Sequence, residues 1–250
     1  MSTYYIIDPI LYDDQFWWKK DDIEFWKHCI GNKNDTVLEL AAGTGRLSLP
    51  LIREKFKYQG LELSNKYVEY ANKKLYLANF DSAISQGNMI SFNFKKKFDF
   101  IFIGFNSFLH LLSNKDASKC LQCVYNHMHK DSIFIIDIFV PHPLVLYKPS
   151  NLKIKNFSFV DSSINNHVDV LESIDYNETT EVMNIHWDYI NTTKDKLYKT
   201  FDFKMKMYFP DTMHNLLYDN GFIIEQIWGD YNLNNFAEDS SLQIYKCSKK

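Results

Sequence analysis

The stretch that decides the fold is Val37-Leu38-Glu39-Leu40-Ala41-Ala42-Gly43-Thr44-Gly45-Arg46. It begins as an apolar strand that carries one acid, Glu39, close to its end. Small residues follow and lead into a helix, so a ligand can approach the backbone of this loop closely. In an open α/β sheet, nucleotide-like cofactors bind at strand tips of this kind. The stretch therefore predicts a cofactor site at the end of the first strand.

The chain around this stretch alternates strands with helices. Hydrophobic periodicity predicts strands at 36–40, 58–63, 83–85, 98–104 and 133–140, and helices at 13–30, 45–54, 65–79 and 115–129. Strands separated by helices favour a parallel, doubly wound sheet. A helix at 210–220 and strands at 222–228 and 242–247 complete the pattern. We therefore expect a Rossmann-like, mostly parallel sheet of seven strands.

The rhythm changes between residues 150 and 208. This segment alternates polar and apolar residues with period two, most clearly in Phe201-Asp202-Phe203-Lys204-Met205-Lys206-Met207, and shows no helix pattern. We therefore expect an antiparallel β insertion at 150–208, after the fifth strand, that acts as a substrate cap. Residues 1–149, including an N-terminal helix, and 209–250 would form the cofactor-binding core.

The composition favours a cytoplasmic protein with a small-molecule ligand. The 250 residues are 46% hydrophobic, which suffices for a packed core, and the net charge of −3 gives no bulk attraction to nucleic acid or an anionic membrane. Met1-Ser2-Thr3-Tyr4-Tyr5 shows no secretory signal, and no apolar run approaches the roughly 18 residues of a membrane span. Four scattered cysteines indicate a reducing compartment. Cys120 and Cys123 form a CxxC pair, but it lies in an expected helix without further ligands, so we expect no metal.

The acid and the glycine loop resemble the first motif of the class I S-adenosylmethionine-dependent methyltransferases, which reads acid, any, small, any, Gly, any, Gly. The defined positions are filled by Glu39, Ala41, Gly43 and Gly45, and Arg46 follows. The glycines would also pass for a degenerate dinucleotide fingerprint. Dinucleotide dehydrogenases normally lack an acid before the glycines, so Glu39 favours the methyltransferase. The resemblance implies that these residues bind S-adenosylmethionine, with Glu39 near its amino group.

Two further strand tips carry residues suited to the same cofactor. Glu62, followed by Leu63, ends the next strand, where a carboxylate can accept two hydrogen bonds from a ribose diol. Gly87-Asn88-Met89 resembles the third methyltransferase motif, Gly-Asp-Met, with an amide in place of the acid. The resemblance implies that Asn88 meets the adenine amino group and that Met89 packs on the ring. Alternatively, Asn88 is only a turn former.

The segment 98–111 resembles the fourth strand and following loop of small-molecule methyltransferases, where the methyl group faces the acceptor. Phe105, Asn106 and His110 are the candidates to line that junction. His110 is the best-placed candidate base, with His142 and His186 behind it. Alternatively, His110 is a core residue, because it stands between two leucines.

Leu11-Tyr12-Asp13 and the segment 17–23 resemble the entry segment of sugar-amine and glycine N-methyltransferases. In such enzymes a Tyr-Asp pair and a basic residue close over the cofactor. The resemblance implies cofactor contacts from Tyr12, Trp18 and Lys20, with Lys19 as the neighbouring alternative. Ordinary helix packing explains the tryptophans equally well.

The leading prediction is a methyltransferase that transfers a methyl group from S-adenosylmethionine to a nitrogen or oxygen of a small-molecule metabolite by in-line displacement. The acceptor would be an amine or an aromatic compound, and the protein a monomer or homodimer without nucleic-acid or membrane partners. The alternatives are an RNA or protein methyltransferase with the same core, a nicotinamide-dependent oxidoreductase and a non-catalytic binding module. No recognisable motif covers residues 150–207, so the sequence does not identify the acceptor.

Overall fold

The computed structural model describes residues 7–250, so the pentapeptide Met1-Ser2-Thr3-Tyr4-Tyr5, in which we expect no secretory signal, lies outside the described residues. The chain divides into two compact units. Unit 1 contains the described part of Met1–Lys19, Leu109–Leu112 and Pro141–Tyr208, and unit 2 contains Lys20–Phe108, Ser113–Val140 and Phe209–Lys250. Among residues 7–250, no helix is long and apolar enough to cross a membrane.

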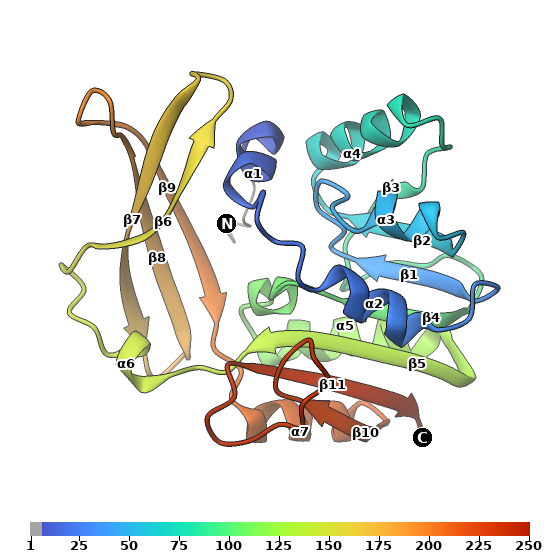
Figure 1. The fold of residues 1–250 in the computed structure, drawn as a ribbon. Helices are drawn as coiled ribbons and strands as arrows, with labels where there is room; N and C mark the ends of the chain where they lie inside the picture. Colours follow the sequence, from blue (N-terminus) through green and yellow to red (C-terminus); the bar gives the residue numbers. More distant parts are fainter. Residues whose placement is uncertain (1–6) are drawn as a thin grey trace. The chain divides into compact units, whose positions relative to one another are not determined.

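Unit 2 is built on a seven-stranded sheet, sheet A, with the strand order β10-β11-β5-β4-β1-β2-β3 (Figure 1). Its strands are β1 (Thr36–Leu40), β2 (Lys57–Glu62), β3 (Ile84–Gln86), β4 (Phe98–Ile103), β5 (Met128–Phe139), β10 (Phe222–Trp228) and β11 (Leu242–Lys249). Strands β1 to β5 pair in parallel, whereas β11 runs antiparallel to both β5 and β10. The predicted Rossmann-like, mostly parallel sheet is confirmed. Chain order reverses between β1 and β4, and such switch points are where α/β proteins bind ligands.

Helices cover both faces of sheet A. They are α2 (Ile23–Ile30), α3 (Ser48–Arg53), α4 (Asn65–Leu77), α5 (Asn114–Asn126) and α7 (Pro210–Asp219), and the 3₁₀ turn η1 (Ser107–His110) follows β4. Helices α2, α3 and α4 bury one face, in a core that includes Val37, Phe100 and Phe102. Alternate residues such as Leu38 and Ile101 are also fully buried but point to the opposite face. Helices α5 and α7 pack against β5 and β10, respectively, and against each other.

Two expected helices differ from the structure. The single helix predicted at 13–30 is wrong, because the chain forms α1 (Pro9–Gln15) in unit 1 and α2 in unit 2 with a turn between them. The aromatic spacing continues across this turn, which made the two helices look like one, but Trp17 is 62% exposed. The helix predicted from residue 45 begins only at Ser48, because Gly43 and Gly45 have φ angles of +56° and +75°.

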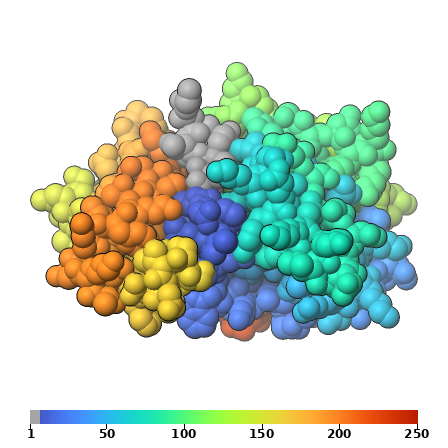
Figure 2. Space-filling view, turned by 90° about the horizontal axis from the view of Figure 1, so that it is seen from above, coloured from blue at the N-terminus to red at the C-terminus, as the bar shows by residue number. Residues whose placement is uncertain are grey.

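Ser64 caps the start of α4. The Ser64 hydroxyl accepts the N–H of Tyr67 at 3.4 Å, which satisfies one of the free donors at the helix start. Helix α4 lies at the surface (Figure 2), and its last residues, Tyr76 and Leu77, are exposed.

Unit 1 is built on a four-stranded antiparallel sheet, sheet B, in the order β6-β7-β8-β9. Its elements are α1, α6 (Pro143–Leu146), β6 (Ile154–Asp161), β7 (Asn166–Asn177), β8 (Val182–Asn191) and β9 (Lys196–Lys206). Helix α1 packs on β6, and the Tyr189 hydroxyl donates to Gln15 Oε1 at 3.0 Å. Trp187, Tyr189 and Phe203 are buried and form the core of the unit. The antiparallel β insertion is confirmed, while its role as a substrate cap stays a prediction.

Candidate functional site

The loop after β1 turns sharply at the carboxyl edge of sheet A, and the N–H groups of Ala42 and Gly45 donate to the carbonyls of Leu61 and Ala42. Ala41, Gly43 and Gly45 all have positive φ angles, of 57°, 56° and 75°. A Cβ added at Gly43 would meet no described atom within 4 Å, whereas one at Gly45 would lie 2.7 Å from Ser48 Oγ and 3.0 Å from Ala71 Cβ. Gly43 therefore leaves open space that a ligand can fill, and Gly45 is required by close packing beneath the loop.

The carboxylate of Glu62 joins this loop to the tip of β2. Its Oε2 accepts the N–H of Gly43 at 2.9 Å, and its Oε1 accepts the N–H of Ser64 at 2.8 Å. Burial raises the pKa of Glu62, and the backbone hydrogen bonds oppose that rise. A carboxylate has about four acceptor positions, so this one can accept two bonds from a ribose diol beyond those it makes. Glu62 thus fits the predicted role, and the open space at Gly43 lies beside it.

Glu39 lies on β1, just before the same loop, and is 6% exposed. Burial raises its pKa to about 8, while the hydrogen bond from Tyr58 and the charge of Arg46 act against the rise. The Tyr58 hydroxyl donates to Oε2 of Glu39 across strands β1 and β2. Tyr58 was not identified from the sequence. Glu39 therefore joins β1 to β2, and its predicted contact with the cofactor amino group stays a prediction.

Arg46 connects the loop with α2 and with the segment after β4. Its guanidinium donates to both oxygens of Asp22, at 2.6 and 2.7 Å, in the bidentate arrangement that makes such pairs strong. Trp26 Nε1 donates to the same carboxylate at 3.2 Å. The guanidinium also lies 5.4 Å from the centre of the Phe105 ring. Arg46 thus positions three segments of unit 2, and no sequence pattern indicates Asp22 as its partner.

The turn after β4 places two consecutive residues in the left-handed region, Phe105 at φ 53° and Asn106 at φ 62°. Such conformations cost about 1–2 kcal/mol for a residue other than glycine and cluster at functional sites. Asp137 on β5 is 1% exposed, and its Oδ1 accepts the N–H of Asn106 at 3.4 Å. Its Oδ2 accepts the Tyr231 hydroxyl at 2.5 Å. Asp137 was not identified from the sequence, although a lone acid within the apolar run 133–139 is a signal that could have indicated it.

Asn88 forms the turn after β3. Its Oδ1 accepts the N–H of Ile90 at 3.1 Å, and its carbonyl accepts the N–H of Ser91 at 3.0 Å. This arrangement is an Asx turn, as the turn-former alternative requires. Asn88, Met89 and Leu63 are all partly buried. Their contacts with the adenosyl group stay predictions.

The residues of the predicted entry segment differ in exposure. Tyr12 lies on α1 with its ring centre 4.8 Å from that of Phe16, and Trp18 is 49% exposed. Lys20 is exposed, whereas its neighbour Lys19 is only 4% exposed. The structure thus buries the alternative lysine. Tyr12, Trp18 and Lys19 belong to unit 1 and Lys20 to unit 2.

The two leading candidate bases belong to unit 1. His110 Nδ1 lies 3.2 Å from the carbonyl oxygen of Lys204, so Nδ1 carries the proton and Nε2 carries the lone pair. Burial lowers the pKa of His110 to about 4, which keeps the ring neutral at pH 7. His142 is exposed and caps α6, because its Nδ1 accepts the N–H of Leu144 at 3.2 Å.

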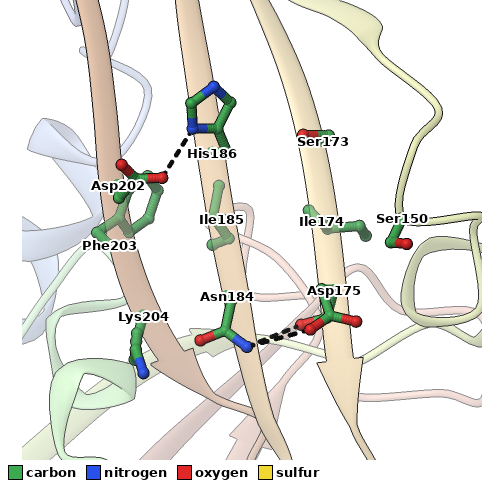
Figure 3. Close-up of a pocket in the computed structure, with 10 residues that line it drawn as sticks. All are labelled: Ser150, Ser173, Ile174, Asp175, Asn184, Ile185, His186, Asp202, Phe203 and Lys204. Carbon is green, nitrogen blue, oxygen red and sulfur yellow. Dashed lines mark hydrogen bonds and ion pairs between the residues drawn. The ribbon is translucent and has the colours of Figure 1, made fainter.

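The third candidate, His186, borders a pocket of about 300 Å³ on sheet B (Figure 3). The pairing of β7, β8 and β9 places its polar lining residues in two rows across the sheet, Ser173-His186-Asp202 and Asp175-Asn184-Lys204. His186 Nδ1 lies 2.7 Å from Asp202 Oδ1, and Nε2 lies 3.0 Å from Asp188 Oδ1. These carboxylates raise the pKa of His186, which favours the protonated ring over a base. Among residues 7–250, no group of His, Cys, Asp or Glu side chains could hold a metal ion.

Residues 37–131 match the family model described as a methyltransferase domain. This segment of the chain is therefore similar to a methyltransferase domain. The glycine loop resembles both a methyltransferase motif and a dinucleotide fingerprint. The match favours the methyltransferase motif, because the matching model describes a methyltransferase domain. Over 102 residues the chain is 24% identical to YqeM of Bacillus subtilis (strain 168), which is provisionally named a methyltransferase. The match covers 41% of this chain and spans 41% of the length of that relative.

Solved methyltransferase structures share the fold over almost the whole chain. An S-adenosylmethionine-dependent methyltransferase from Clostridium acetobutylicum ATCC 824 is 21% identical, with 95% of this chain and 96% of that chain covered and a TM-score of 0.75. The sugar N-methyltransferase KedS8 from Streptoalloteichus sp ATCC 53650 is 16% identical, with coverages of 98% and 96% and a TM-score of 0.69. The predicted resemblance to class I S-adenosylmethionine-dependent methyltransferases is thus confirmed for domain and fold.

We expect the two loop glycines to respond differently to alanine. Gly45→Ala adds a Cβ 2.7 Å from Ser48 Oγ at a positive φ angle, so the free energy of unfolding should fall by about 2–4 kcal/mol. Gly43→Ala adds a Cβ in open space, so the free energy of unfolding should fall only by the cost of the left-handed conformation, about 1 kcal/mol. Urea denaturation measures both values. Equal losses would contradict the packing role assigned to Gly45.

We expect Glu39 to make stability depend on pH. Its folded-state pKa of about 8 exceeds the ordinary 4.5, so the folded protein holds the Glu39 proton more tightly than the unfolded chain does. The stability that this proton contributes is complete below pH 4.5 and is lost as pH rises through 8. A pKa difference of one between the folded and unfolded states corresponds to about 1.4 kcal/mol. The Glu39→Gln variant should therefore gain stability relative to wild type between pH 5 and 9. Thermal unfolding across this range measures the difference, with exposed Glu24→Gln as the control; parallel curves would refute the raised pKa.

Proposed function

We propose that this protein is an S-adenosylmethionine-dependent methyltransferase that methylates a nitrogen or oxygen of a small molecule. The arrangement of Glu62 carries this proposal. Its buried carboxylate accepts the Gly43 N–H at the tip of β1 while retaining acceptor positions for a ribose diol, and Gly43 leaves the adjacent space open. The methyltransferase domain over residues 37–131 supports the same conclusion.

The cofactor would be held mainly by unit 2. Glu62 would bind the ribose, Asn88 and Met89 the adenine, and the loop from Ala41 to Gly45 would lie against the amino-acid part. Leu63, Phe105 and Arg46 would surround it, and Glu39 would lie near its amino group. From the entry segment, Tyr12, Trp18 and Lys20 would add contacts. When bound, S-adenosylmethionine supplies an activated methyl group that transfers by in-line displacement, so the protein mainly has to align the reactants.

A small amine is the acceptor that we favour. The fold shared with a sugar N-methyltransferase supports nitrogen, and the net charge of −3 argues against an RNA acceptor. We propose that the core 1–149 and 209–250 binds the cofactor and that the insertion 150–208 caps the acceptor. The described cysteines are all unpaired, in keeping with a cytoplasmic protein. We expect a monomer or homodimer.

His110 would serve as a neutral hydrogen-bond acceptor for the nucleophile. Its pKa of about 4 lies far below that of an alkylammonium, about 10, so an amine would lose its proton to water before it binds. The lone pair of the ring lies on Nε2, because Nδ1 donates to the Lys204 carbonyl. His142, which caps α6, would play at most a secondary part.

Calorimetric titration with S-adenosylmethionine tests the proposal. The wild-type protein should bind the cofactor, and Glu62→Gln should weaken binding at least tenfold, because an amide loses the charge-assisted bonds to the ribose, worth about 1.5–3 kcal/mol. Glu54→Gln, at a partly exposed position, serves as the matched control and should bind normally. Thermal unfolding must show that Glu62→Gln remains folded. If the wild type does not bind the cofactor, the proposal is wrong.

A further inference from the structure

The side-chain amide of Asn106 has a fixed orientation. The N–H of Phe139 donates to its Oδ1 at 2.7 Å. Because an N–H donor cannot face an NH₂ group, this bond decides which end of the amide is the oxygen. Nδ2 makes no hydrogen bond to any residue among 7–250 and is not a buried unsatisfied atom. The amide therefore presents two donor protons at an accessible position.

The backbone of Asn106 is also hydrogen-bonded, at the longer distance of 3.4 Å. Asp137 accepts the Asn106 N–H on one oxygen and the Tyr231 hydroxyl on the other. Burial and the charge of Asp137 raise the pKa of Tyr231 far above its ordinary value, so Tyr231 remains a donor at any physiological pH. Asn106 thus connects the end of β4 to β5 through both its main chain and its side chain.

The preceding residue is fixed from the other side of the turn. The Phe105 ring lies beneath the Arg46 guanidinium, which Asp22 holds through two hydrogen bonds. The strained pair Phe105–Asn106 is therefore determined by contacts on both flanks. A donor fixed in this way loses little entropy when a ligand accepts its hydrogen bond, which is the condition for effective positioning.

We propose that Asn106 Nδ2 donates a hydrogen bond to an oxygen of the methyl acceptor, and that Asp137 and Tyr231 are positioning residues that aim this donor. The inference rests on the proposed methyltransferase function and narrows its substrate class. An NH₂ group can only donate, so it selects acceptors with a hydroxyl or carbonyl oxygen close to the nucleophilic nitrogen. A simple alkylamine has no oxygen that could accept the hydrogen bond from Asn106 Nδ2.

Two amines serve as probes, D-glucosamine, which carries hydroxyl groups beside its nitrogen, and cyclohexylamine, which has none. Release of S-adenosylhomocysteine from S-adenosylmethionine measures the methylation of each. The wild-type protein should show at least a tenfold higher kcat/KM for glucosamine. Asn106→Asp keeps an oxygen for the Phe139 N–H but removes both donor protons, so it should abolish this preference. Asn93→Asp is the matched control, because exposed Asn93 also accepts a backbone N–H, from Lys95, on its Oδ1.

The positioning role has a separate test. Tyr231→Phe removes the hydroxyl that holds Asp137, so kcat for glucosamine should fall several-fold while calorimetric binding of S-adenosylmethionine is unchanged. Tyr76→Phe, on the exposed end of α4, controls for the substitution and should leave both values unchanged. A loss of cofactor binding that parallels the loss of kcat would instead indicate a general structural role and overturn the assignment.

Binding can also be observed without turnover. The side-chain amide signals of Asn106 in a ¹⁵N spectrum, identified by their absence in Asn106→Asp, should shift when glucosamine is added with S-adenosylhomocysteine, but not when cyclohexylamine is added. No shift with glucosamine would overturn the inference, as would an unchanged glucosamine preference in Asn106→Asp. Neither result touches the proposed function, which fails only if the wild-type protein does not bind S-adenosylmethionine.

Discussion

One buried carboxylate organises the cofactor edge of this protein. Glu62 ends β2, and its two oxygens accept N–H groups from Gly43, after β1, and from Ser64, which caps α4. The glycine loop, the second strand and the fourth helix are thereby fixed relative to one group. Burying a carboxylate is costly unless hydrogen bonds compensate for it, and the backbone provides them here. The open space at Gly43 thus has a defined shape before any ligand arrives.

Two other buried acids repeat this principle in unit 2. Asp22 holds Arg46 through two hydrogen bonds, and Asp137 holds Asn106 and Tyr231. Each acid connects elements that are distant in the chain, namely α2 with the glycine loop, and β5 with the turn after β4 and the C-terminal hairpin. The three carboxylates therefore join the loops at the strand tips to neighbouring elements, and fixed positions of this kind suit a reaction that depends mainly on alignment.

The polar and apolar faces of sheet B have different physical roles. Its apolar face buries Trp187, Tyr189 and Phe203, so these aromatic side chains are core residues of unit 1. Its polar face aligns charges across strands, where Asp188 binds both Lys153 and His186. Period-two alternation predicted this division, because successive side chains of a strand point to opposite faces. The alternation carries no information about which ligand either face meets.

The sequence by itself determined the parallel core, the antiparallel insertion, the glycine loop and the acid at the second strand tip. These features arise from local periodicity and from residue types that few other conformations accommodate. Only the tertiary structure decided that the N-terminal segment forms two helices, that Asp22 pairs with Arg46, and that Asp137 and Phe139 orient Asn106. Those pairings join residues 24 to 33 positions apart, and hydrogen bonds over such separations leave no periodic trace in a single sequence. Local patterns reveal the elements, whereas the donor and acceptor partners depend on how the elements pack.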